Sequence, residues 1–154
     1  MEICDRPTKS NTINSMHHHI LNKTAMNELA TQMASQAKVG DVFGLKGTLG
    51  AGKSFFTSCF VNALMDKKID VLSPTFNLLY SYQTNKGLVH HFDLYRLKSA
   101  DDLENIGFFE CLKDGICLIE WPEIAEQFLP KNYTKINIEI KNEEEREVRI
   151  NYKL

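Results

Sequence analysis

Two helices are predicted where apolar residues lie three or four positions apart, because that spacing places them on one helical face. The first is expected over about residues 23–38 and ends before Gly40, whose conformational freedom suits a helix C-terminus. The second is expected over residues 54–65. The apolar positions are Met26, Leu29, Ala30, Met33 and Ala37 in the first, and Phe56, Phe60, Ala63 and Leu64 in the second. Residues 1–19 are polar and show no periodicity, so we expect them to be a poorly ordered leader.

Short apolar runs and alternating stretches predict the strands. One run, residues 116–119, is entirely apolar, which is typical of a strand buried on both faces. Two pairs of strands are expected to form hairpins, one around residues 84–87 and one around the acidic turn at 143–145. The predicted strands cover residues 41–46, 69–72, 78–83, 88–95, 116–119, 133–140 and 148–152. A short helix is expected to begin near Ser99.

A glycine-rich segment, Gly47-Thr48-Leu49-Gly50-Ala51-Gly52-Lys53-Ser54, fits the phosphate-loop pattern G-x-x-x-x-G-K-[ST] at every fixed position. It stands between a predicted strand and a predicted helix, which directs backbone N–H groups and a helix N-terminus at a phosphate. Lys53 supplies a positive charge for the β- and γ-phosphates, and the Ser54 hydroxyl suits Mg²⁺. We therefore expect a nucleoside triphosphate to bind with Mg²⁺. The expected contacts are Leu49, Gly50, Ala51, Gly52, Lys53, Ser54 and Phe55.

With this loop, the order of elements predicts an α/β, P-loop NTPase-like fold of three layers, with a mixed central sheet and a C-terminal β-hairpin. The length of 154 residues suits one domain, which we assign to residues 20–154. Hydrophobic residues make up 43% of the chain and charged residues 25%, as in soluble globular proteins. No CxxC pair, signal peptide or bilayer-length apolar run is evident, so we expect reduced thiols and a cytoplasmic location.

Hydrolysis needs a carboxylate at the end of a neighbouring strand, and two acids are candidates. Glu120 follows the apolar run 116–119, which would deliver it to the carboxyl edge of the sheet, where ligands bind in open α/β folds. Its alternative role is a helix-capping acid before the next helix. Asp93 follows a less regular run, and its alternative role is a structural partner of Arg96. The candidate catalytic residues are therefore Lys53, Asp93 and Glu120, and the candidate metal ligands are Ser54, Asp93 and Glu120.

Four further residues near these acids carry open alternatives. Thr75 stands in a loop where its hydroxyl could sense a γ-phosphate or Mg²⁺, or it is an ordinary loop threonine. Trp121 directly follows Glu120 and either packs beside the site or is an ordinary half-buried aromatic residue. His90 and His91 could be general bases, but they are expected on opposite faces of one strand, so they cannot act as a pair on one ligand.

Four sequence blocks together resemble the TsaE (YjeE) family, in family order and across about residues 20–130. They are the phosphate loop, Ser73-Pro74-Thr75-Phe76, His91-Phe92-Asp93-Leu94-Tyr95-Arg96-Leu97 and Ile119-Glu120-Trp121-Pro122-Glu123. The resemblance implies a small ATPase, with ATP and Mg²⁺ as cofactors, needed for threonylcarbamoyl modification of the adenosine beside the tRNA anticodon. It also implies TsaB and TsaD as partners, with tRNA contacted only through their complex. The net charge of -2 agrees, since a free-standing nucleic-acid binder is usually basic.

The resemblance also implies individual roles. The phosphates would lie on residues 50–54, and Mg²⁺ on Ser54 and Glu120 with Asp93 in or next to its shell. The roles of three more residues follow in the same way: Thr75 in a switch-like loop, Trp121 by the nucleotide or a partner surface, and Thr24 near the nucleotide. The chain departs from the family in having Thr48 where Asp is usual, which removes a charge, and Ser54 where Thr is usual, which keeps the hydroxyl.

Three other functions remain as alternatives. A small-molecule P-loop kinase would need arginines in a lid, but the chain has only Arg6, Arg96, Arg146 and Arg149 and no lid-like insertion. A GTPase-like switch would need a guanine-selecting N-K-x-D sequence, which is absent. A nucleotide-dependent binding module, in which hydrolysis is incidental, is compatible with all the motifs.

Overall fold

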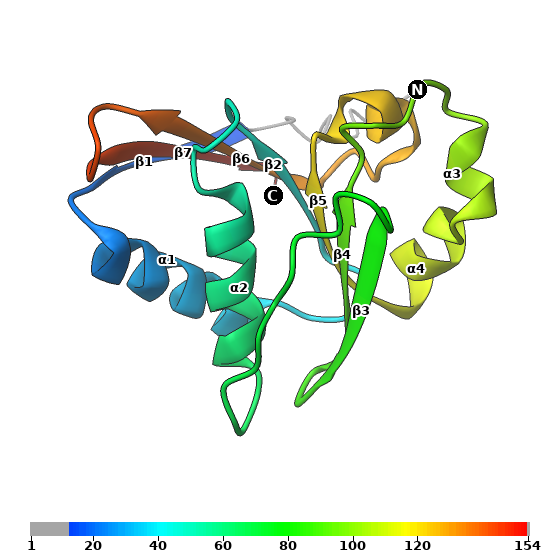
Figure 1. Cartoon of the computed structure of the whole chain (residues 1–154), viewed down its shortest axis with the longest axis horizontal. Coiled ribbons are helices and arrows are strands. Elements are labelled where there is room, and N and C mark those ends of the chain that lie inside the picture. Colours follow the sequence, from blue (N-terminus) through cyan, green and yellow to red (C-terminus); the bar gives the residue numbers. More distant parts are fainter. Residues whose placement is uncertain (1–12, 154) are drawn as a thin grey trace, which may run out of the picture.

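A seven-stranded mixed sheet forms the centre of the protein, in the order β1-β7-β6-β2-β5-β4-β3 (Figure 1). The computed structural model describes residues 13–153. The strands are β1 (Ile13–Ile20), β2 (Val42–Lys46), β3 (Leu79–Thr84), β4 (Gly87–Asp93), β5 (Gly115–Glu120), β6 (Thr134–Ile140) and β7 (Arg146–Lys153). The pairs β2–β5, β2–β6 and β4–β5 are parallel, and the remaining pairs are antiparallel. Both predicted hairpins, β3–β4 and β6–β7, are present.

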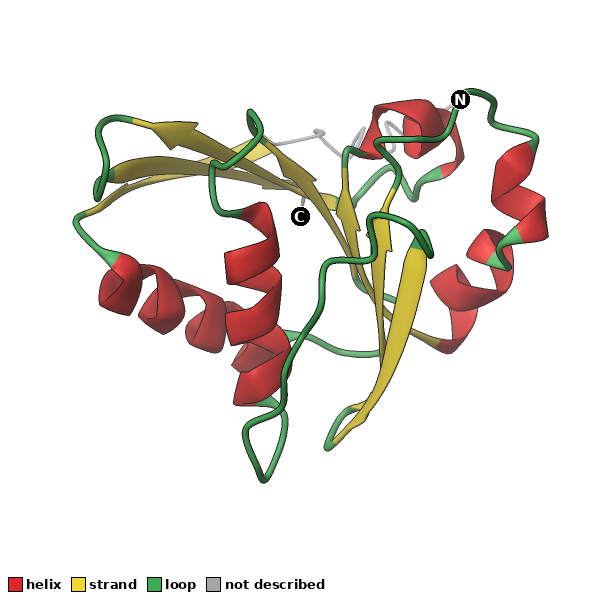
Figure 2. Cartoon of the chain, in the orientation of Figure 1, coloured by secondary structure: helices red, strands yellow, loops and turns green. Residues whose placement is uncertain are grey.

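Helices cover both faces of this sheet (Figure 2). On one face lie α1 (Lys23–Gln36) and α2 (Lys53–Ala63). On the other lie α3 (Asp102–Asn105), α4 (Phe108–Asp114) and the 3-10 helix η1 (Pro122–Phe128). The structure therefore has the three-layer α/β fold predicted from the sequence. Among the described residues, no helix has the length and apolar character needed to cross a membrane.

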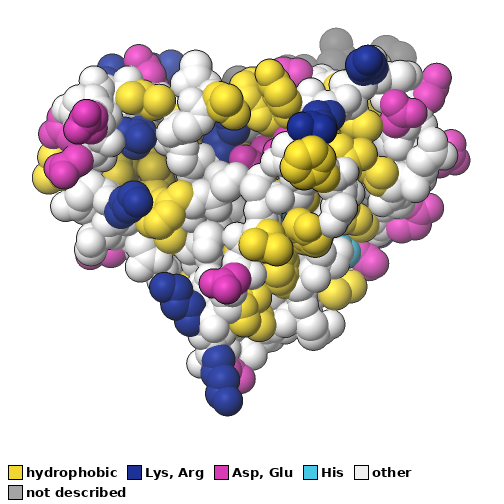
Figure 3. Space-filling view, in the orientation of Figure 1, with side chains coloured by type: hydrophobic (Ala, Val, Ile, Leu, Met, Phe, Trp, Pro, Cys, Tyr) yellow, Lys and Arg dark blue, Asp and Glu magenta, His cyan; other side chains and the backbone are white. Residues whose placement is uncertain are grey.

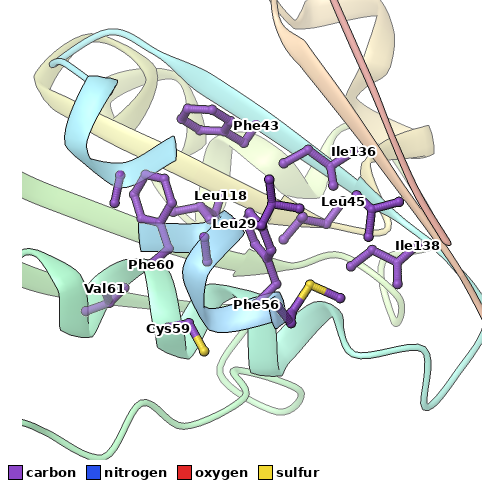
Figure 4. Close-up of a cluster of buried hydrophobic side chains, with 14 of the residues drawn as sticks. Leu29, Phe43, Leu45, Phe56, Cys59, Phe60, Val61, Leu118, Ile136 and Ile138 are labelled. Atoms are coloured by element: carbon purple, nitrogen blue, oxygen red, sulfur yellow. The ribbon is translucent and has the colours of Figure 1, made fainter. Parts of the chain in front are cut away.

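Each face has its own hydrophobic core, because neighbouring strand residues point to opposite sides. On β2 and β5, Phe43 and Leu118 join the core beneath α1 and α2, which Figure 4 shows in close-up. There the rings of Phe43 and Phe60 meet edge to face, with centroids 5.3 Å apart. Val42, Cys117 and Ile119 join the second core, under α3, α4 and η1. Every residue of β5 is buried, as expected for a central strand.

The ends of α1 are fixed by side chains. At its start, the Asn22 side chain accepts a hydrogen bond of 2.9 Å from the Ala25 N–H. At its end, the Lys86 ammonium, from the β3–β4 turn, donates to the carbonyls of Ala34, Ser35 and Ala37. These contacts satisfy backbone groups that a helix leaves without partners at its termini.

Two sequence predictions of local structure were wrong. Residues 13–19 were assigned to a poorly ordered leader, but they form β1, which pairs with β7 along its whole length; residues 1–12 lie outside the described residues. Residues 69–72 were expected to be a strand but form a loop, because no strand lies beside them. Instead, the Asn62 side chain bonds to both the N–H and the carbonyl of Ile69.

Candidate nucleotide-binding and catalytic site

The phosphate loop connects β2 to α2, as its motif predicts. Gly52, immediately before α2, has a φ of 111°, which a residue with a Cβ rarely adopts. Gly47 approaches the backbone of β6 so closely that a Cβ would lie 2.6 Å from the Ile138 carbonyl oxygen. These two positions require glycine for different reasons, and together they turn the chain sharply from the sheet into the helix.

Lys53 begins α2, and its side chain folds back over the loop. Its ammonium donates to the carbonyls of Gly47, at 2.5 Å, and Thr48, at 3.3 Å, and lies 3.9 Å from the centroid of the Trp121 ring. The residue is only 5% exposed. Burial lowers the pKa of Lys53, while the nearby charges of Glu120 and Asp93 act in the opposite direction. A cation held in this way at a helix N-terminus is well placed to meet an anion.

Glu120 lies at the carboxyl end of β5 and faces the start of α2. The Ser54 hydroxyl is 3.0 Å from each of its carboxylate oxygens. On the other side, His91 Nε2 donates to Glu120 Oε2 at 2.5 Å, and its Nδ1 atom is buried with no hydrogen-bond partner in the described structure. His91 is fully buried and Glu120 is 3% exposed. The alternative of a simple helix-capping acid therefore does not describe Glu120, whose carboxylate turns towards α2.

Asp93 is the direct neighbour of Glu120 across the parallel β4–β5 pair. Its carboxylate accepts a 3.0 Å hydrogen bond from the Tyr95 N–H, and the Thr75 hydroxyl lies 3.5 Å away. It forms no ion pair with Arg96, whose guanidinium instead lies 4.3 Å from the centroid of the Phe76 ring. Burial and the Glu120 charge raise the pKa of Asp93, against the effect of the Tyr95 N–H.

Sequence-predicted residues from four separate segments therefore meet at one edge of the sheet. They are Ser54 and Lys53 from α2, Thr75 from the loop before β3, Asp93 from β4, and Glu120 and Trp121 from β5 and the turn after it. Two buried carboxylates and two hydroxyls make an oxygen-rich donor set of the kind that Mg²⁺ prefers.

A pocket of about 550 Å³ lies beside the phosphate loop, between it and the start of α1. Five residues that the sequence assigned to nucleotide binding line it: Thr24, Gly50, Ala51, Gly52 and Phe55. Leu49 was assigned as well, but this residue is 81% exposed and does not line the pocket.

Arg146 also lines this pocket, and the sequence did not point to it. Its guanidinium donates to the Ala51 carbonyl at 2.9 Å and to three carbonyls of the β6–β7 turn. Because 95 residues separate Arg146 from Ala51, only the folded sheet brings them together. No local pattern in the sequence could have indicated this contact.

Comparison with known proteins places the chain in a family. The family model described as "Threonylcarbamoyl adenosine biosynthesis protein TsaE" matches residues 20–148. The chain belongs to the TsaE family. The resemblance seen in the four sequence blocks is thereby confirmed, and the matched residues contain the whole site described above.

Relatives with similar sequences carry the name "tRNA threonylcarbamoyladenosine biosynthesis protein TsaE". One from Rickettsia felis is 38% identical over 81% of this chain and 73% of its own length. One from Aquifex aeolicus is 40% identical over 80% of this chain and 86% of its own length. Among solved structures, the crystal structure of YdiB from Bacillus subtilis matches with a TM-score of 0.73 at 30% identity, covering 93% of this chain and 88% of that one. The chain therefore shares its fold with this solved structure.

In this TsaE chain, the loop between α2 and β3 runs along the face of the molecule turned towards the viewer, between α2 and the β3–β4 hairpin (Figure 1). Hydrophobic side chains gather on that face in the space-filling view (Figure 3). Phe76 in this loop is 79% exposed and Tyr95, just after β4, is 61% exposed. The Tyr95 ring lies 4.9 Å from that of Trp121, so an exposed aromatic surface continues inward to Lys53.

Proposed function

We propose that this chain takes part in threonylcarbamoyladenosine biosynthesis on tRNA as an ATP-binding and ATP-hydrolysing subunit that requires Mg²⁺. We further propose that it acts with TsaB and TsaD and contacts tRNA only through them. One observation carries the proposal: the Ser54 hydroxyl and the buried Glu120 carboxylate face each other at 3.0 Å, beside Lys53, in a chain of the TsaE family. A buried carboxylate destabilises the fold unless a cation, a ligand or a hydrogen-bond donor pairs with it, so such groups are common at functional sites.

The triphosphate is proposed to lie in the phosphate loop. Backbone N–H groups at the start of α2 would bind its oxygens, and the Lys53 ammonium would leave the carbonyls of Gly47 and Thr48 to pair with the β- and γ-phosphates. This exchange is favourable because a charge-assisted hydrogen bond to phosphate is stronger than one to a neutral carbonyl. Apolar side chains of the adjoining pocket, Ile20, Met26 and Phe55, offer a surface for the adenine ring.

Ser54, Glu120 and Asp93 fit a magnesium ion. All three offer oxygen, and the two carboxylates are neighbours at one sheet edge, where a divalent cation would offset their mutual repulsion. When bound, Mg²⁺ supplies charge neutralisation for the phosphate oxygens. Of the two acids, Asp93 is the better candidate for orienting water and accepting its proton, since its pKa is raised. Glu120 is held in place by Ser54 and His91, which suits a fixed ligand.

The first test is the affinity for Mg-ATP measured by calorimetry. Lys53→Ala removes one charge-assisted contact and is expected to weaken binding by at least about tenfold to a hundredfold. Lys67→Ala is the matched control, because Lys67 is exposed and lies beyond the end of α2. Equal Mg-ATP affinity in the wild type and Lys53→Ala would show that the nucleotide does not occupy the loop.

The second test concerns the partners. A pull-down with TsaB and TsaD, with and without Mg-ATP, is expected to retain this chain, and its ATPase rate is expected to change in the complex. An absence of both effects would contradict the proposed partners while leaving the calorimetric result intact. The two parts of the proposal are therefore tested separately.

A further inference from the structure

A second polar cluster lies on the opposite face of the sheet from the phosphate loop. His90 on β4 is 3% exposed, and Cys111 and Asp114 lie on α4, which covers that face. One ligand atom from each, the imidazole Nε2 or Nδ1, the Cys111 Sγ and a carboxylate oxygen, lie within 4.8 Å of one another. No other group of three His, Cys, Asp or Glu side chains comes this close within residues 13–153. The sheet separates this cluster from His91 and Glu120.

The chemistry of the donors selects the kind of cation. Imidazole nitrogen, cysteine sulfur and carboxylate oxygen are together the ligands of Zn²⁺ and similar transition-metal ions, whereas Mg²⁺ and Ca²⁺ favour oxygen alone. Cys111 and Asp114 are three residues apart on α4, so their side chains lie on one side of the helix. A helix and a strand thus approach a common point with three ligands of the required types.

The hydrogen bonds of His90 suit a metal ligand. His90 Nε2 lies 2.6 Å from Asp114 Oδ1, and Nδ1 lies 2.7 Å from the Ser81 hydroxyl. In the neutral ring, Nε2–H donates to Asp114 and Nδ1 accepts from Ser81. If Nε2 binds a cation, the ring proton moves to Nδ1 and the Ser81 oxygen accepts it, because a hydroxyl can donate or accept. Such a partner on the second nitrogen is usual for metal-bound histidine.

The surrounding backbone makes room for this ring. Gly115 stands between α4 and β5, and a Cβ there would lie 2.8 Å from His90 Nε2 and 2.6 Å from the Leu88 carbonyl oxygen. The side chain of Asp114 is 54% exposed, so the cluster is open to solvent on one side. A cation can therefore enter, and water can serve as a fourth ligand.

We propose that His90, Cys111 and Asp114 form a binding site for a divalent cation of the zinc class, with Ser81 as a positioning residue. Coordination replaces the His90–Asp114 hydrogen bond, since Nε2 and the carboxylate then bind the same ion. The Cys111 thiol releases one proton to solvent, while the His90 proton stays on the ring. The ion ties β4 to α4, and the site is independent of nucleotide binding.

Cobalt(II) is the probe, because it occupies zinc sites and its thiolate complexes absorb in the near ultraviolet. Titrated into the metal-free full-length protein without nucleotide, it is expected to give this absorption at one ion per chain, and Zn²⁺ is expected to displace it. The oxygen donors around Ser54 give no thiolate absorption. Cys111→Ser should abolish the signal, and Ser81→Ala should weaken cobalt binding by about tenfold to a hundredfold. Cys59→Ser, on the opposite face of the sheet, is the matched control and should keep it.

Asp114→Asn keeps the test decisive if a buried variant fails to fold, because it changes an exposed side chain. Its cobalt affinity is expected to fall at least about tenfold, with an unchanged circular dichroism spectrum. The proposal is overturned if the wild type gives no thiolate absorption, if Cys111→Ser keeps it, or if Asp114→Asn binds cobalt as tightly as the wild type.

Discussion

The side chains of two consecutive histidines of β4 lie on opposite faces of one sheet, and their surroundings differ. His91 is fully buried and donates to Glu120, which also faces Ser54. His90 is almost as buried, but it bonds to Asp114, whose side chain is 54% exposed. The first histidine therefore fixes an acid beneath a helix N-terminus, whereas the second reaches a polar group that remains open to solvent.

The difference between the two sites shows which kind of site a sequence motif can reveal. The phosphate loop is a motif because one continuous segment dictates its own backbone path, through glycines at positions such as Gly52. The His90 cluster draws on β3, β4 and α4, and its members meet only after the hairpin register and the packing of α4 are set. Such a cluster has no spacing that would mark it in the sequence.

The largest effect is expected from Glu120→Gln, which keeps the shape of the side chain and removes its charge. We expect ATP turnover to fall about a hundredfold or more, with ATP still bound by the loop and Lys53. Phosphate release and calorimetry measure the two properties separately. Glu110→Gln, an exposed acid on α4, is the control on the other face and should leave turnover unchanged.

The same variant distinguishes an ATPase from a binding module. If Glu120→Gln binds ATP, no longer hydrolyses it, and still supports formation of threonylcarbamoyladenosine with the partners, then hydrolysis is incidental. If it turns ATP over at the wild-type rate, Glu120 has no part in the chemistry, and the difference between the two faces of the sheet is not a functional one.

An intermediate effect is expected from His91→Leu, which removes the hydrogen bond to Glu120. Leaving a buried acceptor without this partner costs about 1–3 kcal/mol of stability. Because the Glu120 carboxylate is then held less firmly in position, turnover is expected to fall roughly tenfold. His91→Gln, which keeps a donor, should recover part of the loss. His90→Leu is expected to act on cobalt binding and not on ATP turnover. Loss of turnover in both leucine variants to the same degree would indicate general damage to β4 rather than two separate sites.

Much of the fold was predictable because its signals are local. The all-apolar run at 116–119 indicated a buried strand, and β5 is buried throughout. The turn at 84–87 indicated the β3–β4 hairpin, and both are present. The acid at position 120 was placed at the sheet edge by the strand that precedes it, and the parallel pairing then brings Asp93 beside it.

The failures came from interactions between distant segments. The histidine-rich stretch at 13–19 has no hydrophobic alternation, and it becomes a strand only because β7 offers an edge with free backbone groups. Arg146 reaches Ala51 across 95 residues, which no local pattern records. The 69–72 stretch shows the reverse case, since a stretch with three apolar residues out of four but no neighbouring strand has no ladder to join.

The smallest expected effect is the change in stability of the nucleotide-free protein on Asp93→Asn, which is separate from the loss of ATP turnover that the proposed role of Asp93 implies. Burial and the charge of Glu120 raise the pKa of Asp93 in the folded state above its ordinary value of 3.8. At pH values between the ordinary pKa and the raised pKa, the folded state holds more protons than the unfolded state. Asp93 therefore makes the free energy of unfolding fall as pH rises through this window. Above this window, the charged carboxylate destabilises the folded state by its full amount. Asparagine removes this destabilisation, while its Oδ1 can still accept from the Tyr95 N–H.

We therefore expect the nucleotide-free Asp93→Asn protein to be more stable than the wild type near neutral pH, by about 0.5–1 kcal/mol, which is within the range of single stabilising substitutions. Urea unfolding at several pH values measures it, and the gap should close as pH falls towards 3.8. Asp70→Asn, the same substitution at an exposed acid, is the control. A variant less stable than the wild type at every pH would mean that the Asp93 charge stabilises the empty site. The buried carboxylate would then have a structural role, and the protein would not be less stable for keeping it as a cation ligand.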